Sequence, residues 1–502
     1  MGIVVRQSIK SSMAAYIGVA IGVINQLYIS TKFLGVDELA LSRLLLENSI
    51  IFATFAHLGT PFIADKFFAR YRDDAQKHHG FFVWLLVLPI LGCAIFVLFY
   101  FIFEAQIQKY FAENSPLVTR YHFLVIPITI FWAYMSVLES YCRNNSRVAI
   151  PAFIREIYLR VVNIVIVLIY GFGWVSFDVF MYLIVLLYAS AVLVLLFYIK
   201  WLGKFYWTYE FFKIIDWALF KEMMFFGLFI LMGGAGANIV LFIDRTMLAG
   251  KSGLTDAGIF IIAATIASII EIPRKSITQI SIPIISHSLK ENDMAHIKRM
   301  YQKSALHQLV AGTLVFLLIF CNLDDLFLLI PKGDIYAQGK WVVILLSASK
   351  LFDMATGLSS EIIMYSRFFK FTTYFLIGIA ILGILANKWL IPLYQFNGAA
   401  LATAFTTLVY SLLRMGFVKY HFNILPYTQQ VWKVVGIFII VYVAIYFIPS
   451  FGVSKWAAFF SIGVKSVIIV CLSAIFIIKW HISEEIDGIF QTIKTNISSK
   501  LS

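Results

Sequence analysis

The chain has 502 residues, of which 61% are hydrophobic and only 13% are charged. Its mean hydropathy of +0.87 excludes a soluble globular protein, whose surface needs far more polar residues. The formal net charge of +13 raises the question of nucleic-acid binding, but the basic residues are dispersed among short polar segments between apolar runs. That distribution is typical of the loops of a membrane protein, so no nucleic-acid partner is expected.

The apolar runs predict an all-α polytopic membrane protein. A helix needs about 20 mostly apolar residues to cross a bilayer, and about fourteen runs approach or exceed that length. They cover residues 12–33, 40–64, 81–103, 118–142, 149–171, 177–199, 223–249, 256–286, 305–323, 341–365, 369–390, 397–418, 431–449 and 455–479. No soluble domain interrupts the series. No cleavable signal is expected, because Arg6 and Lys10 precede the first run and no small-residue cleavage site is evident.

The loop charges predict the orientation. With the N-terminus in the cytoplasm, the inner segments hold roughly three times as many Lys and Arg residues as the outer ones, and the excess alternates from loop to loop. Both termini are therefore predicted to be cytoplasmic. Arg414 is counted in this pattern with the inner segment that follows the twelfth run.

An internal repeat predicts the division of the chain. Tyr28–Gly35 (YISTKFLG) ends the first run much as Phe242–Gly250 (FIDRTMLAG) ends the seventh, and the run that follows each of them reaches a proline, Pro61 or Pro273. Six spans per copy give the two copies the same orientation, as in parallel repeats, and the substrate site is expected between them. The predicted parts are an N-terminal lobe (1–202), a cytoplasmic linker (203–222), a C-terminal lobe (223–421) and two further helices with a cytoplasmic tail (422–502).

Several motifs are better explained by structure than by catalysis. Gly250–Ser252 (GKS) resembles part of a phosphate-binding loop, but Arg245 stands where that loop needs its first glycine. Asp37–Glu38 resembles the acidic pair of membrane glycosyltransferases, but its loop is too short for an acceptor and suits a helix N-terminus. Asp324–Asp325 is interpreted in the same way. The nine histidines show no metal-ligand spacing, so neither an enzyme nor a metal site is expected.

Three glycines, Gly233, Gly234 and Gly236, lie in the middle of the seventh run. One interpretation is close helix packing through small residues. The other is a flexible point that lets the two halves of the protein rock. The sequence leaves both open.

Charged residues inside the runs carry the functional signal, because a charge at mid-depth costs roughly 2.5–3.5 kcal/mol and usually faces a bundle interior. The basic ones are Arg43, Arg155, Arg160, Arg245, Arg274, Lys275, Lys350 and Lys465. Three pairs are spaced for contact on one helix, namely Arg43–Glu47, Glu156–Arg160 and Lys350–Asp353. Lys465 has no evident partner, and contact with a lipid headgroup or a pyrophosphate stays open.

Together the cations predict an anionic substrate. Arg43 and Arg245 are placed toward the outer leaflet, Lys350 lies near mid-depth, and Lys10, Arg274 and Lys275 are placed toward the inner leaflet. Such side chains donate charge-assisted hydrogen bonds to phosphate oxygens. Asn25, a polar residue within the first run, completes the set of candidate substrate-binding residues.

Three stretches resemble a known family. They are Phe33–Leu45 (FLGVDELALSRLL), Phe242–Gly250 followed by Thr255–Ile266 (TDAGIFIIAATI), and Ile391–Arg414 (IPLYQFNGAALATAFTTLVYSLLR). With its run count and its repeat, the chain resembles, over essentially its whole length, the polysaccharide or O-antigen flippases of the multidrug/oligosaccharidyl-lipid/polysaccharide exporter superfamily.

The resemblance implies two six-helix lobes around a central cationic cavity in a bacterial cytoplasmic (inner) membrane protein. It implies movement of an undecaprenyl-pyrophosphate-linked oligosaccharide by alternating access, for surface polysaccharide or lipopolysaccharide biosynthesis. Membrane lipids, a polysaccharide polymerase and glycosyltransferases are the implied partners, and no cofactor is implied. Coupling to a proton or sodium gradient, or to the membrane potential, would use an acidic residue, for which Glu47, Glu139, Asp244 and Glu271 are the candidates.

Three alternatives stay open. A lipid II flippase typically has an arginine-rich first span followed by an Asp-Ala-Phe segment, and neither is evident here. A cation-coupled small-molecule exporter of the same superfamily usually has 12 spans and fewer cavity cations. A membrane glycosyltransferase or glycan polymerase, which belongs to another class, predicts a large outer loop with essential acidic residues.

Overall fold

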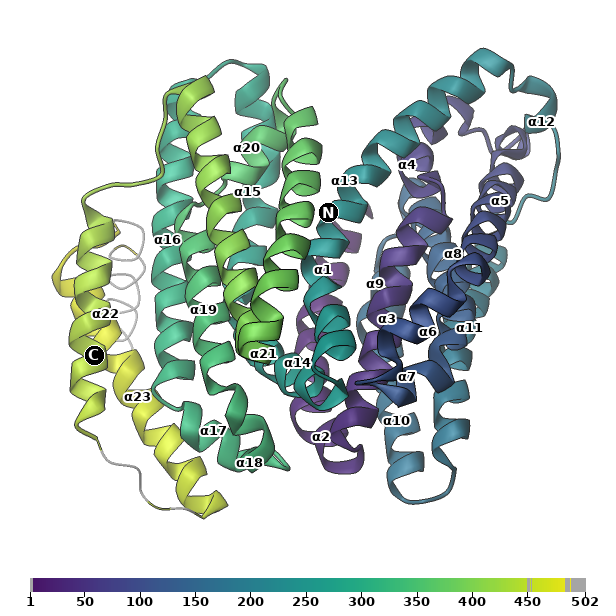
Figure 1. Cartoon of the computed structure of the whole chain (residues 1–502). Coiled ribbons are helices and arrows are strands. Elements are labelled where there is room, and N and C mark those ends of the chain that lie inside the picture. Colours follow the sequence, from purple (N-terminus) through teal and green to yellow (C-terminus); the bar gives the residue numbers. More distant parts are fainter. Residues whose placement is uncertain (1–2, 449–451, 453, 484–487, 489–502) are drawn as a thin grey trace, which may run out of the picture. The chain divides into compact units, whose positions relative to one another are not determined.

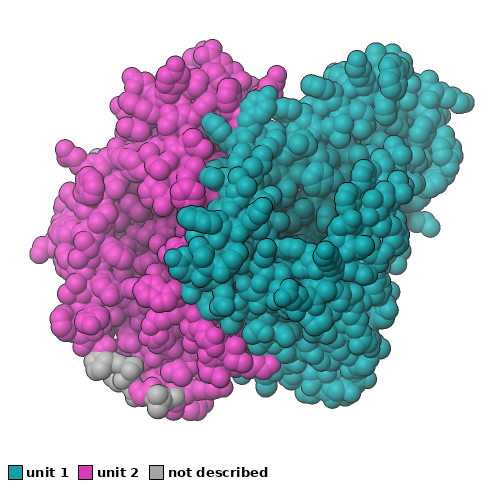
Figure 2. All heavy atoms as spheres, in the orientation of Figure 1, with its two compact units in different colours: residues 1–262, 373–399 teal, residues 263–372, 400–502 magenta. Residues whose placement is uncertain are grey.

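The computed structural model describes residues 3–448, 452, 454–483 and 488, and within these residues it consists of helices with no β-strand (Figure 1). The predicted all-α class is therefore confirmed. Two compact units divide the chain (Figure 2). Unit 1 takes its residues from 1–262 and 373–399, and unit 2 takes its residues from 263–372 and 400–502.

Unit 1 contains the helices of the first half of the chain. They are α1 (Ile3–Ile24), α2 (Ser30–Phe33), α3 (Val36–Ala56), α4 (Thr60–Tyr71), α5 (Phe81–Ile102), α6 (Glu104–Ala112), α7 (Pro116–Tyr121), α8 (Val125–Asn144), α9 (Ala149–Phe153), α10 (Leu159–Gly171), α11 (Phe177–Trp201), α12 (Phe211–Ile214), α13 (Trp217–Lys251) and most of α14 (Leu254–Ser268). The π-helices η1 (Asn25–Ile29) and η4 (Ile154–Tyr158) and the 3₁₀ turns η2 (Lys77–Gly80) and η3 (His122–Leu124) lie between them.

Unit 2 contains most of the second half. Its elements are η5 (Ile269–Glu271), α15 (Ile272–Lys290), α16 (Met294–Phe320), α17 (Leu323–Leu329), α18 (Gly333–Tyr336), η6 (Ala337–Gly339), α19 (Lys340–Ala355), α20 (Ser359–Tyr365), α22 (Gln430–Tyr446) and α23 (Lys455–Lys479). Helix α21 (Lys370–Phe422) contributes residues to both units. An apolar core joins α16, α22 and α23 through residues such as Leu317, Val441 and Ile469.

Among the described residues, ten helices are long and apolar enough to cross a membrane, and the bent pair Gly333–Ala355 with Ser359–Tyr365 raises the number to eleven. Large apolar side chains on these helices are exposed, such as Phe197 at 70% and Phe225 at 77%. Such surfaces suit contact with lipid and are too apolar for water. The chain is thus a multi-span membrane protein.

The predicted number of fourteen spans is not reached by these criteria and stays a prediction. The difference has three local causes. Helix α21 holds both predicted runs 369–390 and 397–418, the predicted run 149–171 is interrupted by η4, and α22 has only 17 residues. The first cause is that two predicted runs join in one helix, and the other two are a break and a short helix within a predicted run, which hydropathy alone does not detect.

The break in α21 falls at Gln395, inside the loop predicted between these two runs. Its backbone angles, φ 51° and ψ −129°, are not helical. Gly398 follows, and a Cβ there would lie 2.1 Å from the carbonyl oxygen of Leu390. The turn therefore requires glycine at this position, because any side chain would collide with the backbone.

Proline begins a new helical segment within two of the predicted spans. Pro61 lies in the first turn of α4, and Pro273 lies in the first turn of α15. The first turn tolerates proline because its amide has no partner within the helix. The two positions behave alike, as the predicted repeat requires.

Helix α13 packs on α3 and α4 and belongs to unit 1 together with residues 373–399. The two units therefore differ in extent from the predicted lobes, and the division into six-helix lobes stays a prediction. A Cβ on Gly233 would lie 3.0 Å from Thr373 Oγ1, and one on Gly236 would lie 3.0 Å from the backbone of Leu376. These contacts support the interpretation of the glycines as packing residues, and α13 is helical through them.

Candidate functional site

The π-helix η1 places polar side chains inside unit 1. A π-turn accommodates an extra residue in a helix and is frequent at functional sites. The π-helix η1 carries Asn25 and Gln26, both buried. Asn25 Nδ2 donates to Asn163 Oδ1 of α10 at 2.9 Å, and Ser30 Oγ donates to Asn25 Oδ1 at 3.2 Å. The candidate Asn25 is therefore part of a polar contact between the first span and α10.

The candidate arginines of unit 1 come from α3 and α13. Arg43 donates to Gln26 Oε1, and Arg245 forms an ion pair with Glu47. The predicted pair between Arg43 and Glu47 on one helix is wrong as a hydrogen-bonded contact, because each side chain takes its partner from another helix. Arg43 still lies close enough to Glu47 and Arg245 to interact electrostatically with both.

Arg160 of α10 joins this group. Its ion pair with Glu156, at 2.9 Å, is the predicted contact between residues four apart. Its guanidinium also interacts electrostatically with that of Arg43. Gly18 of α1 makes room for it, since a Cβ at Gly18 would lie 2.8 Å from Arg160 Nη1 and 2.5 Å from the carbonyl oxygen of Glu156.

We call Gln26, Arg43, Glu47, Arg160 and Arg245 the arginine cluster. Each has a buried side-chain atom without a hydrogen-bond partner in the described part of the chain, namely Gln26 Nε2, Arg43 Nε, Glu47 Oε2, Arg160 Nη1 and Arg245 Nε. Buried polar atoms in proteins are almost always paired, so each exception needs an explanation. All but one of these atoms are donors. The cluster therefore has more donors than acceptors, an arrangement that suits the oxygens of an anion.

Further polar contacts hold α13 in unit 1. The candidate Asp244 is buried, and Asn387 of α21 donates to its Oδ1 at 2.5 Å. Thr246 donates to Asn48 at 2.5 Å, and Asn238 donates to Thr54 at 2.8 Å. The face of α13 toward α3 is thus polar over several turns.

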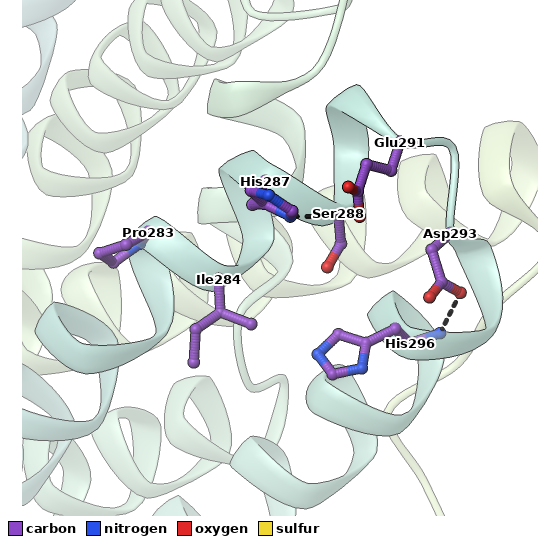
Figure 3. Close-up of a pocket in the computed structure, with 7 residues that line it drawn as sticks. All are labelled: Pro283, Ile284, His287, Ser288, Glu291, Asp293 and His296. Atoms are coloured by element: carbon purple, nitrogen blue, oxygen red, sulfur yellow. Dashed lines mark hydrogen bonds and ion pairs between the residues drawn. The ribbon is translucent and has the colours of Figure 1, made fainter.

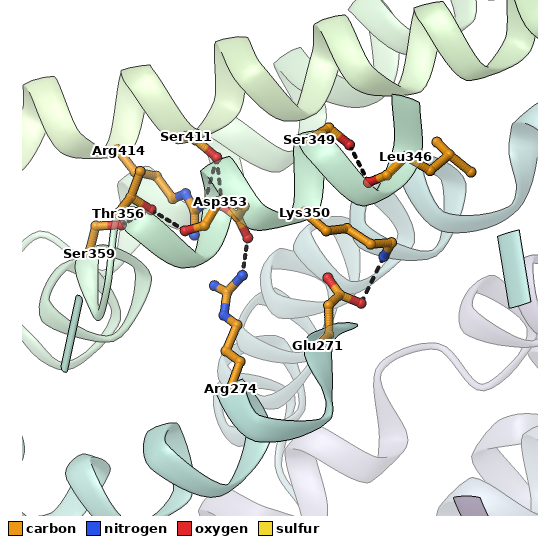
Figure 4. Close-up of polar contacts among 10 residues, drawn as sticks. All are labelled: Glu271, Arg274, Leu346, Ser349, Lys350, Asp353, Thr356, Ser359, Ser411 and Arg414. Atoms are coloured by element: carbon orange, nitrogen blue, oxygen red, sulfur yellow. Dashed lines mark hydrogen bonds and ion pairs between the residues drawn. The ribbon is translucent and has the colours of Figure 1, made fainter. Parts of the chain in front are cut away.

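A second network lies in unit 2, centred on Asp353 of α19 (Figure 4). Arg274 of α15 and Arg414 of α21 each form an ion pair with it. Ser411 Oγ also donates to Asp353 Oδ1, at 2.5 Å. Arg414 is only 3% exposed, because a buried carboxylate holds it inside the helix bundle, and its place on the cytoplasmic side stays a prediction.

The candidates Lys350 and Glu271 form an ion pair at 2.8 Å next to this network (Figure 4). The expected pair of Lys350 with Asp353 is therefore wrong, since Asp353 is occupied by two arginines. Lys350 and Glu271 remain partly accessible, with 21% and 31% of their side chains exposed. The candidates Lys10 and Lys275 are exposed and take part in neither network.

Two further ion pairs lie outside these networks, and the second of them is buried. The candidate Glu139 of α8 pairs with Arg155 at 2.5 Å. Lys465 of α23 pairs with Asp325 of α17 at 2.9 Å, and Ser461 Oγ donates to the same carboxylate at 2.7 Å. Lys465 therefore has a protein partner. Its spacing in the sequence could not reveal this partner, because Asp325 lies 140 residues away in the chain.

The acidic pair near the start of α3 has a structural role. Glu38 accepts hydrogen bonds from the amide of Gly35 at 2.7 Å and from the hydroxyl of Tyr170 at 2.7 Å. Asp37 accepts one from Thr255 Oγ1 at 2.6 Å. Both lie in the first turn of α3, as predicted.

The hairpin of α15 and α16 carries an open pocket of about 410 Å³ (Figure 3). Its lining residues are Pro283, Ile284, His287, Ser288, Glu291, Asp293 and His296. His287 Nδ1 lies 3.2 Å from Glu291 Oε2, and Asp293 accepts from the amide of His296 at 2.9 Å as the cap of α16. None of the predicted site residues lines it. In the described residues, no group of three His, Cys, Asp or Glu side chains is arranged to hold a metal ion.

The sequence missed Gln26, Asn163, Arg414 and the central role of Asp353. The signal that the chain offers for these residues is their polarity within apolar runs. This signal is weak for Gln26 and Asn163, because an amide inside a span is less costly than a charge.

Comparison with known proteins gives a family and a fold. Residues 4–289 match the family model described as "Polysaccharide biosynthesis protein". No curated protein matches the chain. The structure of the lipid II flippase MurJ in an inward closed conformation is similar, with a TM-score of 0.70 and 13% identity over 94% of this chain and 99% of that one.

An inward-facing multidrug resistance MATE family transporter of the MOP superfamily is also similar, with a TM-score of 0.62 and 13% identity over 83% of this chain and 98% of that one. A MATE protein in the straight conformation gives a TM-score of 0.54 and 15% identity over 84% of this chain and 96% of that one. At these identities the likeness concerns the fold.

Proposed function

Because the chain belongs to the polysaccharide biosynthesis protein family and shares the fold of MurJ and the MATE transporters, we propose that it is a flippase for an undecaprenyl-pyrophosphate-linked oligosaccharide. The substrate crosses the bacterial cytoplasmic membrane by alternating access, and the glycan then serves surface polysaccharide biosynthesis. The family match also agrees with the resemblance found in the sequence.

The arginine cluster is the observation that favours an anionic substrate, because it has more unpaired hydrogen-bond donors than acceptors. Four buried N–H donors, on Gln26, Arg43, Arg160 and Arg245, have no partner in the described residues. A pyrophosphate offers acceptor oxygens in a compact group, and guanidinium groups bind such oxygens with matched geometry. An uncharged drug-like substrate would leave these donors unpaired.

In this proposal Glu47 couples substrate binding to the movement of an ion. A phosphate that binds Arg245 competes with the Glu47 carboxylate for the same guanidinium. A buried carboxylate that loses its partner is costly until another cation replaces it. The exchange of partners at Arg245 therefore frees Glu47, which in this proposal is the coupling residue.

Unit 2 supplies further candidate contacts. Lys350 is partly exposed and paired with Glu271, so an anion can compete for it as for Arg245. Arg274 is held by Asp353, which Arg414 and Ser411 also contact. In this proposal Lys350 contacts substrate, and the Asp353 network holds α15, α19 and α21 in register.

The test is transport by charge-neutralised variants. Arg43→Gln and Arg245→Gln are expected to lose export of surface glycan in cells, and also movement of a lipid-linked oligosaccharide in proteoliposomes. Arg120→Gln is the control, because Arg120 pairs with Asp178 and neither residue belongs to the cluster or to the ion-coupling candidates. Membrane expression of all three variants is measured alongside. Full export by both cluster variants at normal expression would refute the proposed role of the cluster.

A lipid II substrate is the second candidate, favoured by the fold shared with the lipid II flippase MurJ. The two substrates share a polyprenyl pyrophosphate and differ in the glycan. Rescue of growth in cells depleted of their lipid II flippase would support the second candidate. Restored surface polysaccharide without such rescue would support the first.

A further inference from the structure

The segment that joins α11 to α13 has an exposed aromatic face. Over residues 203–209 exposed side chains alternate with partly buried ones. This is the pattern of an extended chain, in which successive side chains point to opposite sides. The exposed side chains are Phe205 at 36%, Trp207 at 59% and Tyr209 at 56%. One side of the segment is therefore aromatic along its length.

The exposed rings form a continuous group. Phe205 and Trp207 stack with their centroids 6.1 Å apart, and Tyr209 lies edge-on to Trp207 at 6.2 Å. Trp207 Nε1 donates to the Tyr209 hydroxyl at 2.9 Å. Phe212 of α12, 43% exposed, continues the row with its centroid 6.3 Å from that of Tyr209. The face is thus an ordered row of rings held by mutual contacts.

The opposite side of the segment is fixed to unit 1. Lys204 forms an ion pair with Asp74, and its carbonyl oxygen accepts a hydrogen bond from the Tyr141 hydroxyl at 2.8 Å. The ring of Tyr206 packs against His78 with centroids 5.0 Å apart. These contacts prevent the aromatic face from turning inward.

Two residues, Phe211 and Gly80, strengthen this attachment through tight contacts. Phe211 is fully buried, with its ring centroid 4.9 Å from that of Tyr71 and 5.0 Å from that of Phe81. Gly80, with φ +80°, lies so close to the carbonyl oxygen of Thr208 that a Cβ would approach it to 2.5 Å. The segment is therefore bound to the loop before α5 by both side-chain and backbone packing.

The aromatic face lies in the chain between the ends of two membrane-spanning helices. Helix α11 ends at Trp201 and α13 begins at Trp217, and these tryptophans are 73% and 75% exposed. Tryptophan and tyrosine are enriched where membrane spans meet the headgroup region, because their rings are apolar and their N–H and O–H groups remain hydrated. The segment between two such helix ends is therefore expected at the same level.

We propose that Phe205, Trp207 and Tyr209 form a lipid-docking surface that lies in the phospholipid headgroup layer where α11 ends and α13 begins. A contiguous apolar patch facing water would be unfavourable, and a headgroup layer removes it from water while leaving the Tyr209 hydroxyl wet. The exposed charges beside it, Lys200, Glu210 and Lys213, are of both signs. Attraction to phospholipid therefore rests on the rings rather than on net charge.

The docking depth is measured through Trp207 in the full-length protein. The protein is reconstituted in phosphatidylcholine bilayers whose chains are brominated near the headgroup or near the chain end. The emission difference between the wild type and Trp207→Phe isolates the signal of Trp207. We expect stronger loss of this emission with bromine near the headgroup than with bromine near the chain end, and weak quenching by aqueous iodide.

Tyr206→Phe is the matched control, because Tyr206 is adjacent and faces inward. It is expected to leave the quenching of Trp207 unchanged. Strong quenching by iodide with none by either brominated lipid would overturn the proposal and place the face in water or against a protein. Stronger quenching by the deep bromine would also overturn it. Transport is not part of this readout, so the outcome is independent of the proposed function.

Discussion

Glu47 of α3 accepts a hydrogen bond from Arg245 of α13, which lies 198 residues farther along the chain. The two side chains are largely buried, with 5% of Glu47 and 15% of Arg245 exposed. Each also keeps one buried polar atom without a partner in the described residues, Glu47 Oε2 and Arg245 Nε. The pair therefore joins two helices of unit 1 while retaining hydrogen-bonding capacity for a ligand.

Removing one partner of this pair is expected to destabilise the protein. Glu47→Ala leaves the Arg245 guanidinium buried without a counter-charge, which costs about 3–5 kcal/mol in comparable sites. Glu47→Gln keeps an acceptor for Arg245 and is expected to cost less. Thermal unfolding of the purified variants in detergent measures both effects.

A double-mutant cycle completes this test. The coupling between Glu47→Ala and Arg245→Ala is expected to be large, because the double variant removes both charges together. Simple additivity of the two single effects would show that the contact contributes nothing to stability.

Two glycines of α1 are expected to differ in their tolerance of alanine. A Cβ at Gly18 would lie 2.5 Å from the backbone oxygen of Glu156, which cannot move cheaply. A Cβ at Gly22 would meet the flexible side chain of Arg160 at 3.3 Å, which can shift. We expect Gly18→Ala to lower the melting temperature clearly and Gly22→Ala to lower it little, as read by thermal unfolding. Equal melting temperatures would contradict the close approach of α1 to η4.

The Asp353 network is expected to depend on its carboxylate more than on its serine. Asp353→Ala leaves both Arg274 and Arg414 without this counter-charge, so the loss is expected to exceed about 3–5 kcal/mol. Ser411→Ala removes one hydrogen bond, at a net cost of about 1 kcal/mol. Denaturant or thermal unfolding separates the two variants. A cost for Ser411→Ala as large as that for Asp353→Ala would argue against Asp353 as the centre of the network.

The buried pair of Asp325 and Lys465 permits a test by apolar replacement. Lys465→Met alone leaves the Asp325 carboxylate buried without its cation and is expected to cost about 3–5 kcal/mol. The double change Asp325→Leu with Lys465→Met removes both charges and is expected to be close to neutral. Unfolding measurements on the wild type, Lys465→Met and the double variant test both expectations. Glycan export by the double variant is expected to stay normal, because the pair lies outside both candidate networks.

Asp74, which lies outside the membrane-spanning helices, is expected to make the stability of the folded protein depend on pH. The hydrogen bond from Lys204 holds the pKa of the Asp74 carboxyl below its usual value. A carboxyl whose pKa is lowered in the folded state stabilises that state above the unfolded pKa of about 3.9, and this contribution is lost as the pH falls through the folded pKa. Its side chain is 61% exposed, so the effect is expected to be small.

The measurement compares the wild type with Asp74→Asn as the pH falls from neutral toward acid. The wild type is expected to be the more stable at neutral pH, and the two melting temperatures are expected to converge in acid. A constant difference at all pH values would show that the ion pair with Lys204 does not contribute through its charge.

The sequence alone determined the class of the protein, because its signals are local. A run of apolar residues long enough to cross a bilayer must be helical, since every backbone group has to be paired within the segment. The prediction of an all-α membrane protein and the family resemblance therefore needed no contact between distant residues. The proline positions Pro61 and Pro273 and the turn before Gly398 were likewise visible in the chain.

The partners of the charged residues were decided only by the tertiary structure. Spacing along a helix places Glu47 within reach of Arg43, and Asp353 within reach of Lys350, but it cannot tell what neighbouring helices offer. In the folded protein Glu47 forms its ion pair with Arg245, and Asp353 forms ion pairs with two arginines. A buried charge is stabilised by the partner that gives the best geometry away from water, and which helix brings that partner is a property of the packing.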